Sequence, residues 1–205
     1  MARRDAIRRA TAATAAVVAL TLVAGCGSGE RQDAGEASAR YPISIVHASF
    51  PARQELAKRT QMRIVVKNLG DDTIPNLAVS IGVAGGGTDV AAFGRLDESA
   101  GLASRSRPVW VVDEGPGNGE TAYANTWAVG PLRPHRTATL TWQVAAVRAG
   151  HYELTYRLAG SLTGRSQLRL KDGGIPRDTF EVDVDRTPRQ VRVTPDGRIV
   201  SEPAK

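Results

Sequence analysis

Four residues that can supply oxygen ligands lie close together in a glycine-rich stretch, residues 113–120. They are Asp113, Glu114, Asn118 and Glu120. Carboxylate and amide oxygens are the ligands that calcium prefers, so this loop is a candidate site for calcium or a small ligand. The spacing matches no EF-hand pattern, and a solvated loop between two strands explains the same composition. We favour the solvated loop and expect no resident metal or cofactor.

Trp110 lies just before this loop, within the apolar run at residues 109–112. An exposed tryptophan there could anchor a binding partner. A tryptophan that points inward would instead belong to the core. We favour the core position and keep Trp110 as a possible member of the ligand loop.

The residue types that carry out acid–base or nucleophilic catalysis are scattered along the chain. His47, His135 and His151 lie in different segments, with no second histidine at metal-ligand spacing. No serine lies in a Gly-x-Ser-x-Gly context. The glycine-rich residues 84–88 lack the lysine and the following helix of a phosphate-binding loop. We therefore expect no enzymatic activity.

Cys26 is the only cysteine in the chain, so no internal disulfide can form. It follows four arginines within the first nine residues and an uncharged, mostly apolar stretch at residues 10–24. A basic segment, an apolar segment and small residues, in this order, are typical of an export signal. The apolar stretch is shorter than the roughly 20 residues of a membrane-spanning helix. Residues 1–25 are therefore predicted to be a signal peptide, for general secretion rather than twin-arginine export.

The end of this segment, Val23-Ala24-Gly25-Cys26, resembles the lipobox of bacterial lipoproteins. In that family the cysteine thiol receives diacylglycerol, and a peptidase cuts before the cysteine. The resemblance implies lipidation of Cys26 and attachment to the extracytoplasmic face of the cell membrane. Two acyl chains suffice for stable anchoring. Residues 26–40 are small and polar after the cysteine, which is typical of a flexible tether.

Charge gives little support for a nucleic-acid partner. The whole chain carries a formal net charge of +6, but four arginines and Asp5 precede Cys26. The mature chain would therefore carry +3. The predicted export from the cell makes a nucleic-acid partner even less expected.

Period-two alternation of apolar and polar residues dominates residues 41–200, which we expect to form one domain ahead of a short tail at 201–205. The clearest runs are at residues 62–66, 77–83, 138–144, 152–158 and 180–184. Shorter strands are expected at 41–50, 107–112 and 122–129, and a terminal hairpin at 191–200. Residues 54–59 form at most one helical turn. This pattern predicts an all-β fold, an antiparallel sandwich.

Two stretches resemble the immunoglobulin-like CARDB modules of bacterial surface proteins. The first is a strand that ends in Asn68-Leu69-Gly70, and the second runs from Val129 through a proline turn to Tyr152. The resemblance implies an immunoglobulin-like β-sandwich. The chain departs from the family pattern by a long inserted loop region at residues 83–122, and the paired cysteines of antibody domains are absent.

These observations favour a non-enzymatic, membrane-anchored surface lipoprotein that acts in binding or envelope assembly. Its expected contacts are the membrane, through lipid on Cys26, and a protein or cell-wall polymer. The alternative function is calcium or small-ligand binding by residues 113–120.

Overall fold

The computed structural model describes residues 38–85, 91–94, 108–117, 119–186, 191–196 and 198–201. The predicted signal peptide, Cys26 and the predicted tether as far as residue 37 lie outside these residues. The regular elements in the described part are all β-strands. No helix in this part is long and apolar enough to cross a membrane. Residues 36–205 belong to one compact unit.

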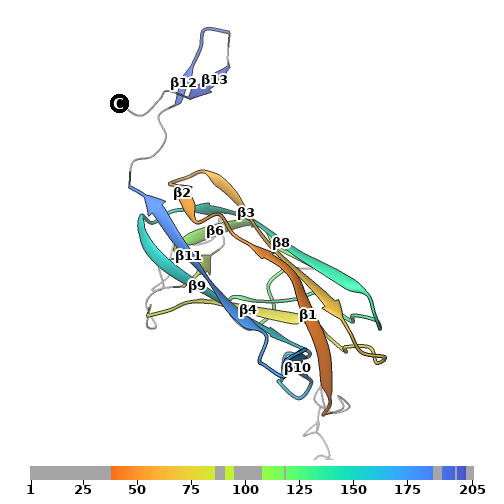
Figure 1. The fold of residues 1–205 in the computed structure, drawn as a ribbon. Coiled ribbons are helices and arrows are strands. Elements are labelled where there is room, and N and C mark those ends of the chain that lie inside the picture. Colours follow the sequence, from red (N-terminus) through yellow and green to blue (C-terminus); the bar gives the residue numbers. More distant parts are fainter. Residues whose placement is uncertain are drawn as a thin grey trace, which may run out of the picture. The chain divides into compact units, whose positions relative to one another are not determined.

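Two sheets make up the body of this unit (Figure 1). Sheet A has the order β10–β1–β3–β8–β6–β5, and sheet B has the order β2–β11–β9–β4–β7. The strands of sheet A are β1 (Arg40–Ser49), β3 (Arg59–Asn68), β5 (Phe93–Gly94), β6 (Trp110–Glu114), β8 (Thr137–Ala146) and β10 (Gln167–Leu170). The strands of sheet B are β2 (Arg53–Glu55), β4 (Ala78–Val83), β7 (Thr126–Ala128), β9 (Gly150–Ala159) and β11 (Arg177–Asp185). The predicted terminal hairpin pairs β12 (Val191–Val193) with β13 (Ile199–Ser201).

The core lies between the two sheets, where the apolar halves of the alternating strands meet. The alternation predicted from the sequence is confirmed. The buried positions include Met62, Ile64 and Val66 of β3, Leu140, Trp142 and Val144 of β8, and Leu154, Tyr156 and Leu158 of β9. The rings of Trp127 and Trp142 meet edge to face at 5.7 Å, so aromatic contacts join sheet B to sheet A. The predicted all-β sandwich is therefore the fold of the described residues.

Both sheets are mixed, because short strands at their edges pair in parallel. The long ladders are antiparallel, as the sequence predicts, whereas β10 pairs in parallel with β1, β5 with β6, and β2 with β11. β7 is the fourth edge strand. All four have at most four residues. Short edge strands limit edge-to-edge aggregation.

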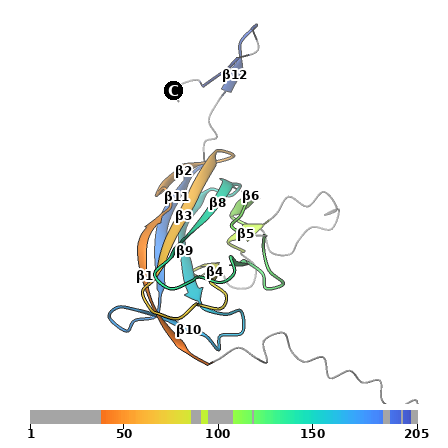
Figure 2. The same ribbon diagram turned by 90° about the vertical axis from the view of Figure 1, so that its right-hand side faces the viewer.

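The chain passes from one sheet to the other directly after the first strand (Figure 2). β1 pairs in sheet A, and the chain then crosses at residues 50–52 to form β2 in sheet B. Residues 54–59, for which the sequence allows at most one helical turn, form no helix, because Arg53–Glu55 is extended and pairs with β11. Three residues are too few to show a strand period in the sequence.

The predicted insert at residues 83–122 contributes β5 and β6 to sheet A. β6 pairs with β8 from Trp110 to Glu114, with a register shift near the end of β6. The described part of this segment is therefore a continuation of the sandwich. Residues 86–90, 95–107 and 118 lie outside the description.

Candidate functional site

Two carboxylates of the predicted ligand loop already have partners within the protein. Asp113 Oδ2 lies 2.9 Å from Arg59 Nε. Glu120 Oε1 accepts a hydrogen bond from the backbone N–H of Asn125. Glu114 is exposed at the end of β6, and Asn118 lies outside the described residues. In the ranges that the structure describes, no three His, Cys, Asp or Glu residues gather as a metal site would require.

Trp110 is a core residue and not an exposed binding anchor. Its side chain is 0% exposed, and its indole Nε1 donates a hydrogen bond to Gln54 Oε1 over 2.8 Å. Its ring meets Phe50 edge to face at 5.4 Å. The apolar bulk and the satisfied N–H explain the burial. Of the two interpretations, the favoured core position is the one that the structure shows.

The three histidines are held apart on different elements. His135 contacts Asp71 at 3.0 Å and His151 contacts Asp183 at 2.8 Å. His47 Nε2 lies 3.0 Å from Ser49 Oγ. This last contact joins exposed neighbours on one strand. No carboxylate contact to His47 is seen among the described residues, so the pair lacks the orienting acid of a catalytic triad.

A different feature, at one side of the sandwich, has the properties of a binding site. Here strand edges of both sheets lack a neighbouring strand. β10 pairs with β1 only as far as Ile43, and β2 pairs with β11 only from Asp183. Among the described residues, 44–49 of β1 and 177–182 of β11 therefore have a paired strand on one side only.

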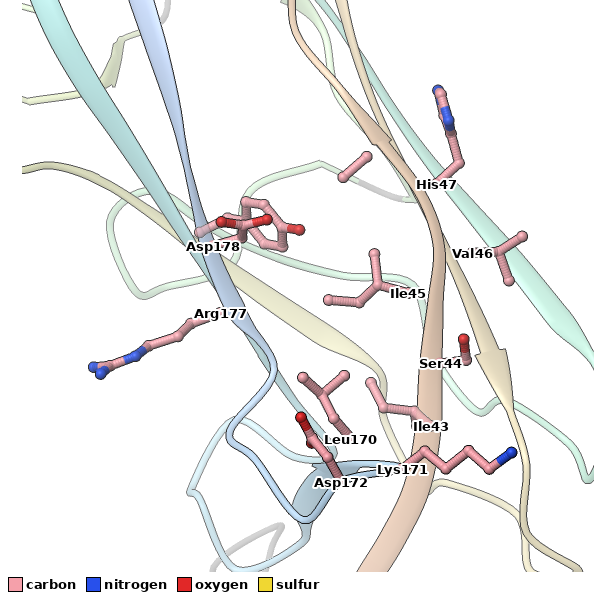
Figure 3. Close-up of a pocket in the computed structure, with 12 residues that line it drawn as sticks. Ile43, Ser44, Ile45, Val46, His47, Leu170, Lys171, Asp172, Arg177 and Asp178 are labelled. Atoms are coloured by element: carbon pink, nitrogen blue, oxygen red, sulfur yellow. The ribbon is translucent and has the colours of Figure 1, made fainter.

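Part of each edge, residues 43–48 of β1 and 177–178 of β11, lines a groove of about 660 Å³, which we call the β1–β11 groove; residues 179–182 continue the open edge of β11 beyond this lining. Its lining comes from β1, β9, β11 and the end of β10 (Figure 3). The lining residues are Ile43, Ser44, Ile45, Val46, His47, Ala48, Tyr156, Leu170, Lys171, Asp172, Arg177 and Asp178. Ile43 and Ile45 point from β1 toward β11, so the groove has an apolar wall (Figure 3).

Tyr156 of β9 combines burial with an unused polar group. The residue is 2% exposed, and its ring stacks on Phe180 with 5.4 Å between centroids. The hydroxyl is buried and has no hydrogen-bond partner among the residues that the structure describes. Burial, together with the negative charge of Asp178, raises the pKa of Tyr156 to about 12. The hydroxyl therefore keeps its proton and can donate a hydrogen bond.

The charged residues of the groove are not distributed evenly. Asp178 extends from β11 toward β1, whereas Arg177 points to the other side of β11 (Figure 3). Lys171 points away from β11, and Asp172 lies beside Leu170 (Figure 3). The interior of the groove is consequently acidic, although basic residues flank it.

Sequence reasoning did not find this groove. Tyr156 fits the alternating pattern of β9, which predicts an ordinary core position. Its hydroxyl, Trp142 Nε1 and Glu55 Oε2 are buried without a hydrogen-bond partner among the described residues, and of these three residues Tyr156 is the one that lines the groove. The sequence carries one signal for the groove. Asp178 is a charged residue on the face of β11 that otherwise carries the apolar residues Phe180, Val182 and Val184.

Comparison with known proteins found similarity to solved structures only at low sequence identity. No protein-family model matches the chain, and no curated protein matches it. Among solved structures, the chain is similar to the CARDB domain of a Pyrococcus furiosus protein, determined in complex with di-metal ions. The identity is 17% and the TM-score 0.40, over 71% of this chain and 90% of that chain.

It is also similar to Escherichia coli alpha-2-macroglobulin from domain MG7 to the C-terminus, with 15% identity and a TM-score of 0.42, over 77% of this chain and 21% of that chain. A mutant Listeria innocua beta-glucosidase in complex with laminaribiose matches with 15% identity and a TM-score of 0.36, over 72% and 16% of the two chains. At these identities the similarities concern the fold alone.

Proposed function

We propose that this chain is a non-enzymatic binding module, held at the extracytoplasmic face of the cell membrane by lipid on Cys26, and that it binds its partner in the β1–β11 groove. The observation that carries the groove assignment is the buried, unpartnered hydroxyl of Tyr156. Leaving a buried donor unsatisfied costs about 1–3 kcal/mol. A partner that accepts this hydrogen bond recovers part of that cost, which favours binding at this place.

Two further features support a binding role over a catalytic one. The groove presents apolar side chains and strand edges, which suit recognition of a surface. The only histidine that lines it, His47, points away from β11 (Figure 3). The partner is a protein or a cell-wall polymer at the envelope.

Site-specific photo-crosslinking in the cells that make the protein tests the groove. A benzoylphenylalanine residue replaces Asp178, which faces the groove, or Arg177, which points away from it (Figure 3). Both positions are exposed, so each replacement is expected to leave the fold intact. We expect a discrete adduct from position 178, several-fold stronger than from position 177. Equal adducts would contradict binding in the groove.

The membrane anchor has a separate test. Cys26→Ala is expected to abolish incorporation of a labelled fatty acid and to release the protein from the membrane fraction, because the acyl chains provide the anchoring energy. The far-ultraviolet circular dichroism of the β-domain should not change. Persistent labelling of the Cys26→Ala variant would show that lipidation at this residue is wrong.

Calcium or small-ligand binding by residues 113–120 is the alternative function. The contacts of Asp113 with Arg59 and of Glu120 with Asn125 weigh against it, because a metal would have to displace both. We expect no rise in the melting temperature at millimolar calcium, whereas a ligand of the folded state must raise it. A rise that Glu120→Gln abolishes would favour the alternative.

A further inference from the structure

We infer that the partner enters the β1–β11 groove as an extended polypeptide, adding a short strand to the open edge of β11. This inference rests on the proposed binding function and names the chemistry of the partner. β-strand addition of this kind uses main-chain hydrogen bonds for affinity and alternate side chains for specificity.

The main-chain groups of alternate β11 residues face away from β9. Leu158 N–H bonds to Pro176 O, which makes this a hydrogen-bonded pair at the start of the ladder. Hydrogen-bonded and non-hydrogen-bonded pairs alternate in an antiparallel ladder. The backbone N–H and C=O groups of Arg177, Thr179 and Glu181 therefore point to the open side. Asp183, next in this series, confirms the alternation, since its N–H bonds to Ala52 O on that side.

Substitute acceptors occupy part of this edge. Arg177 N–H bonds to Ile175 O over 2.9 Å. Thr179 N–H bonds to the carboxylate of Asp178 over 2.8 Å. An incoming strand would replace these two local acceptors, whereas no acceptor of the Glu181 N–H is seen among the described residues.

The open edge of β1 is less suitable. Its register with β3 shifts between Ile45 and His47, so a bulge interrupts the regular spacing of its main-chain groups. Bulges commonly protect an edge from further pairing. β11 has an unbroken register with β9 over the whole of residues 177–184. The incoming strand should therefore pair with β11 and lie over the apolar wall of β1.

The ends of the edge fix the length of the partner segment. β2 occupies the β11 edge from Asp183 onward, and the open part begins at Arg177. These six positions span roughly 20 Å at about 3.3 Å per residue. A segment of five or six residues fills this space, continuing the line of β2.

Charge complementarity selects the side chains of this segment. Asp178 lies on the inner face of β11, directly across the ladder from Tyr156. A strand paired with β11 would place one of its inward side chains beside this carboxylate. We expect a lysine or arginine there, and apolar or hydroxyl side chains at the other inward positions, where one of them can accept the Tyr156 hydrogen bond.

Amide hydrogen exchange of the full chain carrying Cys26→Ala tests strand addition. The probe is a capped hexapeptide, Thr-Val-Lys-Val-Thr-Val, at millimolar concentration. The Glu181 amide should exchange about tenfold more slowly, which corresponds to roughly 90% occupancy. Thr179 should show slower exchange as well. The Phe180 amide already faces β9, and its exchange should not change.

Matched variants separate strand addition from other binding modes. Asp178→Lys should weaken binding of the lysine peptide at least severalfold, while Asp72→Lys, on the β3–β4 turn outside the groove, should not. A peptide with glutamate in place of lysine should bind more weakly to the parent chain.

Unchanged exchange at Glu181, or equal binding by the parent chain and Asp178→Lys, would overturn strand addition. If a crosslink still forms at position 178 and a protease fails to digest the attached partner, the groove binds a polymer that is not polypeptide. The binding function then stands and the extended-peptide inference fails. Because benzoylphenylalanine at position 178 also removes the Asp178 carboxylate, the same probe is placed at Ile45 on the opposite wall. If neither position 178 nor position 45 gives a crosslink, the binding function itself fails.

Discussion

The hydroxyl groups of Tyr152 and Tyr156 lie on the same strand in contrasting environments. Tyr152 donates a hydrogen bond to Ala149 O over 3.0 Å, whereas the Tyr156 hydroxyl is buried without a partner. Removing a satisfied hydroxyl loses a hydrogen bond worth about 1 kcal/mol, while removing an unsatisfied one loses none. The two residues therefore form a matched pair for mutagenesis.

Tyr152→Phe should lower the free energy of unfolding by about 1 kcal/mol. Tyr156→Phe should leave it unchanged or raise it by up to about 1 kcal/mol. Urea unfolding of both variants measures the difference. A larger loss for Tyr156→Phe than for Tyr152→Phe would mean that its hydroxyl is satisfied in the free protein, and would remove the main support for the groove.

His151 gives the protein a small dependence on pH. Its hydrogen bond to Asp183 and its attraction to that carboxylate raise its pKa above 6.5, and Glu181 and Glu153 add to the effect. A pKa raised by folding stabilises the folded state fully below the unfolded pKa. This contribution is lost as the pH rises through the folded pKa.

We therefore expect the melting temperature to fall slightly between pH 6 and pH 8. His151→Gln should reduce this fall, and so should Asp183→Asn, which removes the partner carboxylate. Thermal melts at several pH values measure the slope. An identical slope in parent and variants would show that the pair contributes nothing to the pH dependence.

The turn between β3 and β4 depends on the side chain of Asn68. This residue is fully buried, and its amide Nδ2 donates to Asp72 O at 2.8 Å and to Leu132 O at 3.1 Å. Its Oδ1 accepts from Gly70 N–H at 3.0 Å. One side chain thus shapes the turn and ties it to the segment before β8.

Asn68→Ala should lower the free energy of unfolding by about 2–4 kcal/mol, because it leaves buried backbone groups unpaired. Asn76→Ala, in the same β3–β4 connection, should change it by less than about 0.5 kcal/mol. Denaturant midpoints measure both. Equal effects of the two substitutions would contradict the structural role of Asn68.

The long strands could be predicted from the sequence because burial of one face imposes a period of two. Leu140, Trp142 and Val144 show this clearly, and all three are buried. The edge strands β2, β5 and β10 have too few residues to display a period of two. Their parallel pairing depends on the path of the chain between distant segments, which the sequence pattern does not show. The groove could not be predicted either, because the sequence does not show which strand edges are left without a neighbouring strand.

Candidate ligands were harder to predict than strands. Asp113 and Glu120 carry oxygen atoms of the kind that calcium binds. Each instead contacts another residue of the protein, Arg59 or Asn125, and the sequence pattern does not identify these partners. Trp110 could have faced either way, and its partner Gln54 lies 56 positions away in the chain. Side-chain partners across long separations require the fold.

At the scale of the whole molecule, several strand edges of the sandwich lack a partner in the described structure: residues 137–142 of β8 pair on one side only, as residues 177–182 of β11 do. Short strands occupy the ends of both sheets, while residues 177–182 of β11 keep a free side in the described structure. In our proposal, lipid on Cys26 holds the β11 edge at the membrane surface, where it retains a partner. Loss of the proposed anchor should leave the groove unchanged.

Crosslinking from position 178 compared with position 177, in cells and with Cys26 intact, tests the binding function most directly. We expect an adduct from position 178 that is several-fold stronger than from its neighbour and that contains a polypeptide. Tyr156→Phe should reduce its yield, because the partner loses the hydrogen bond from the buried hydroxyl. Adducts of equal yield from both positions would contradict binding in the groove.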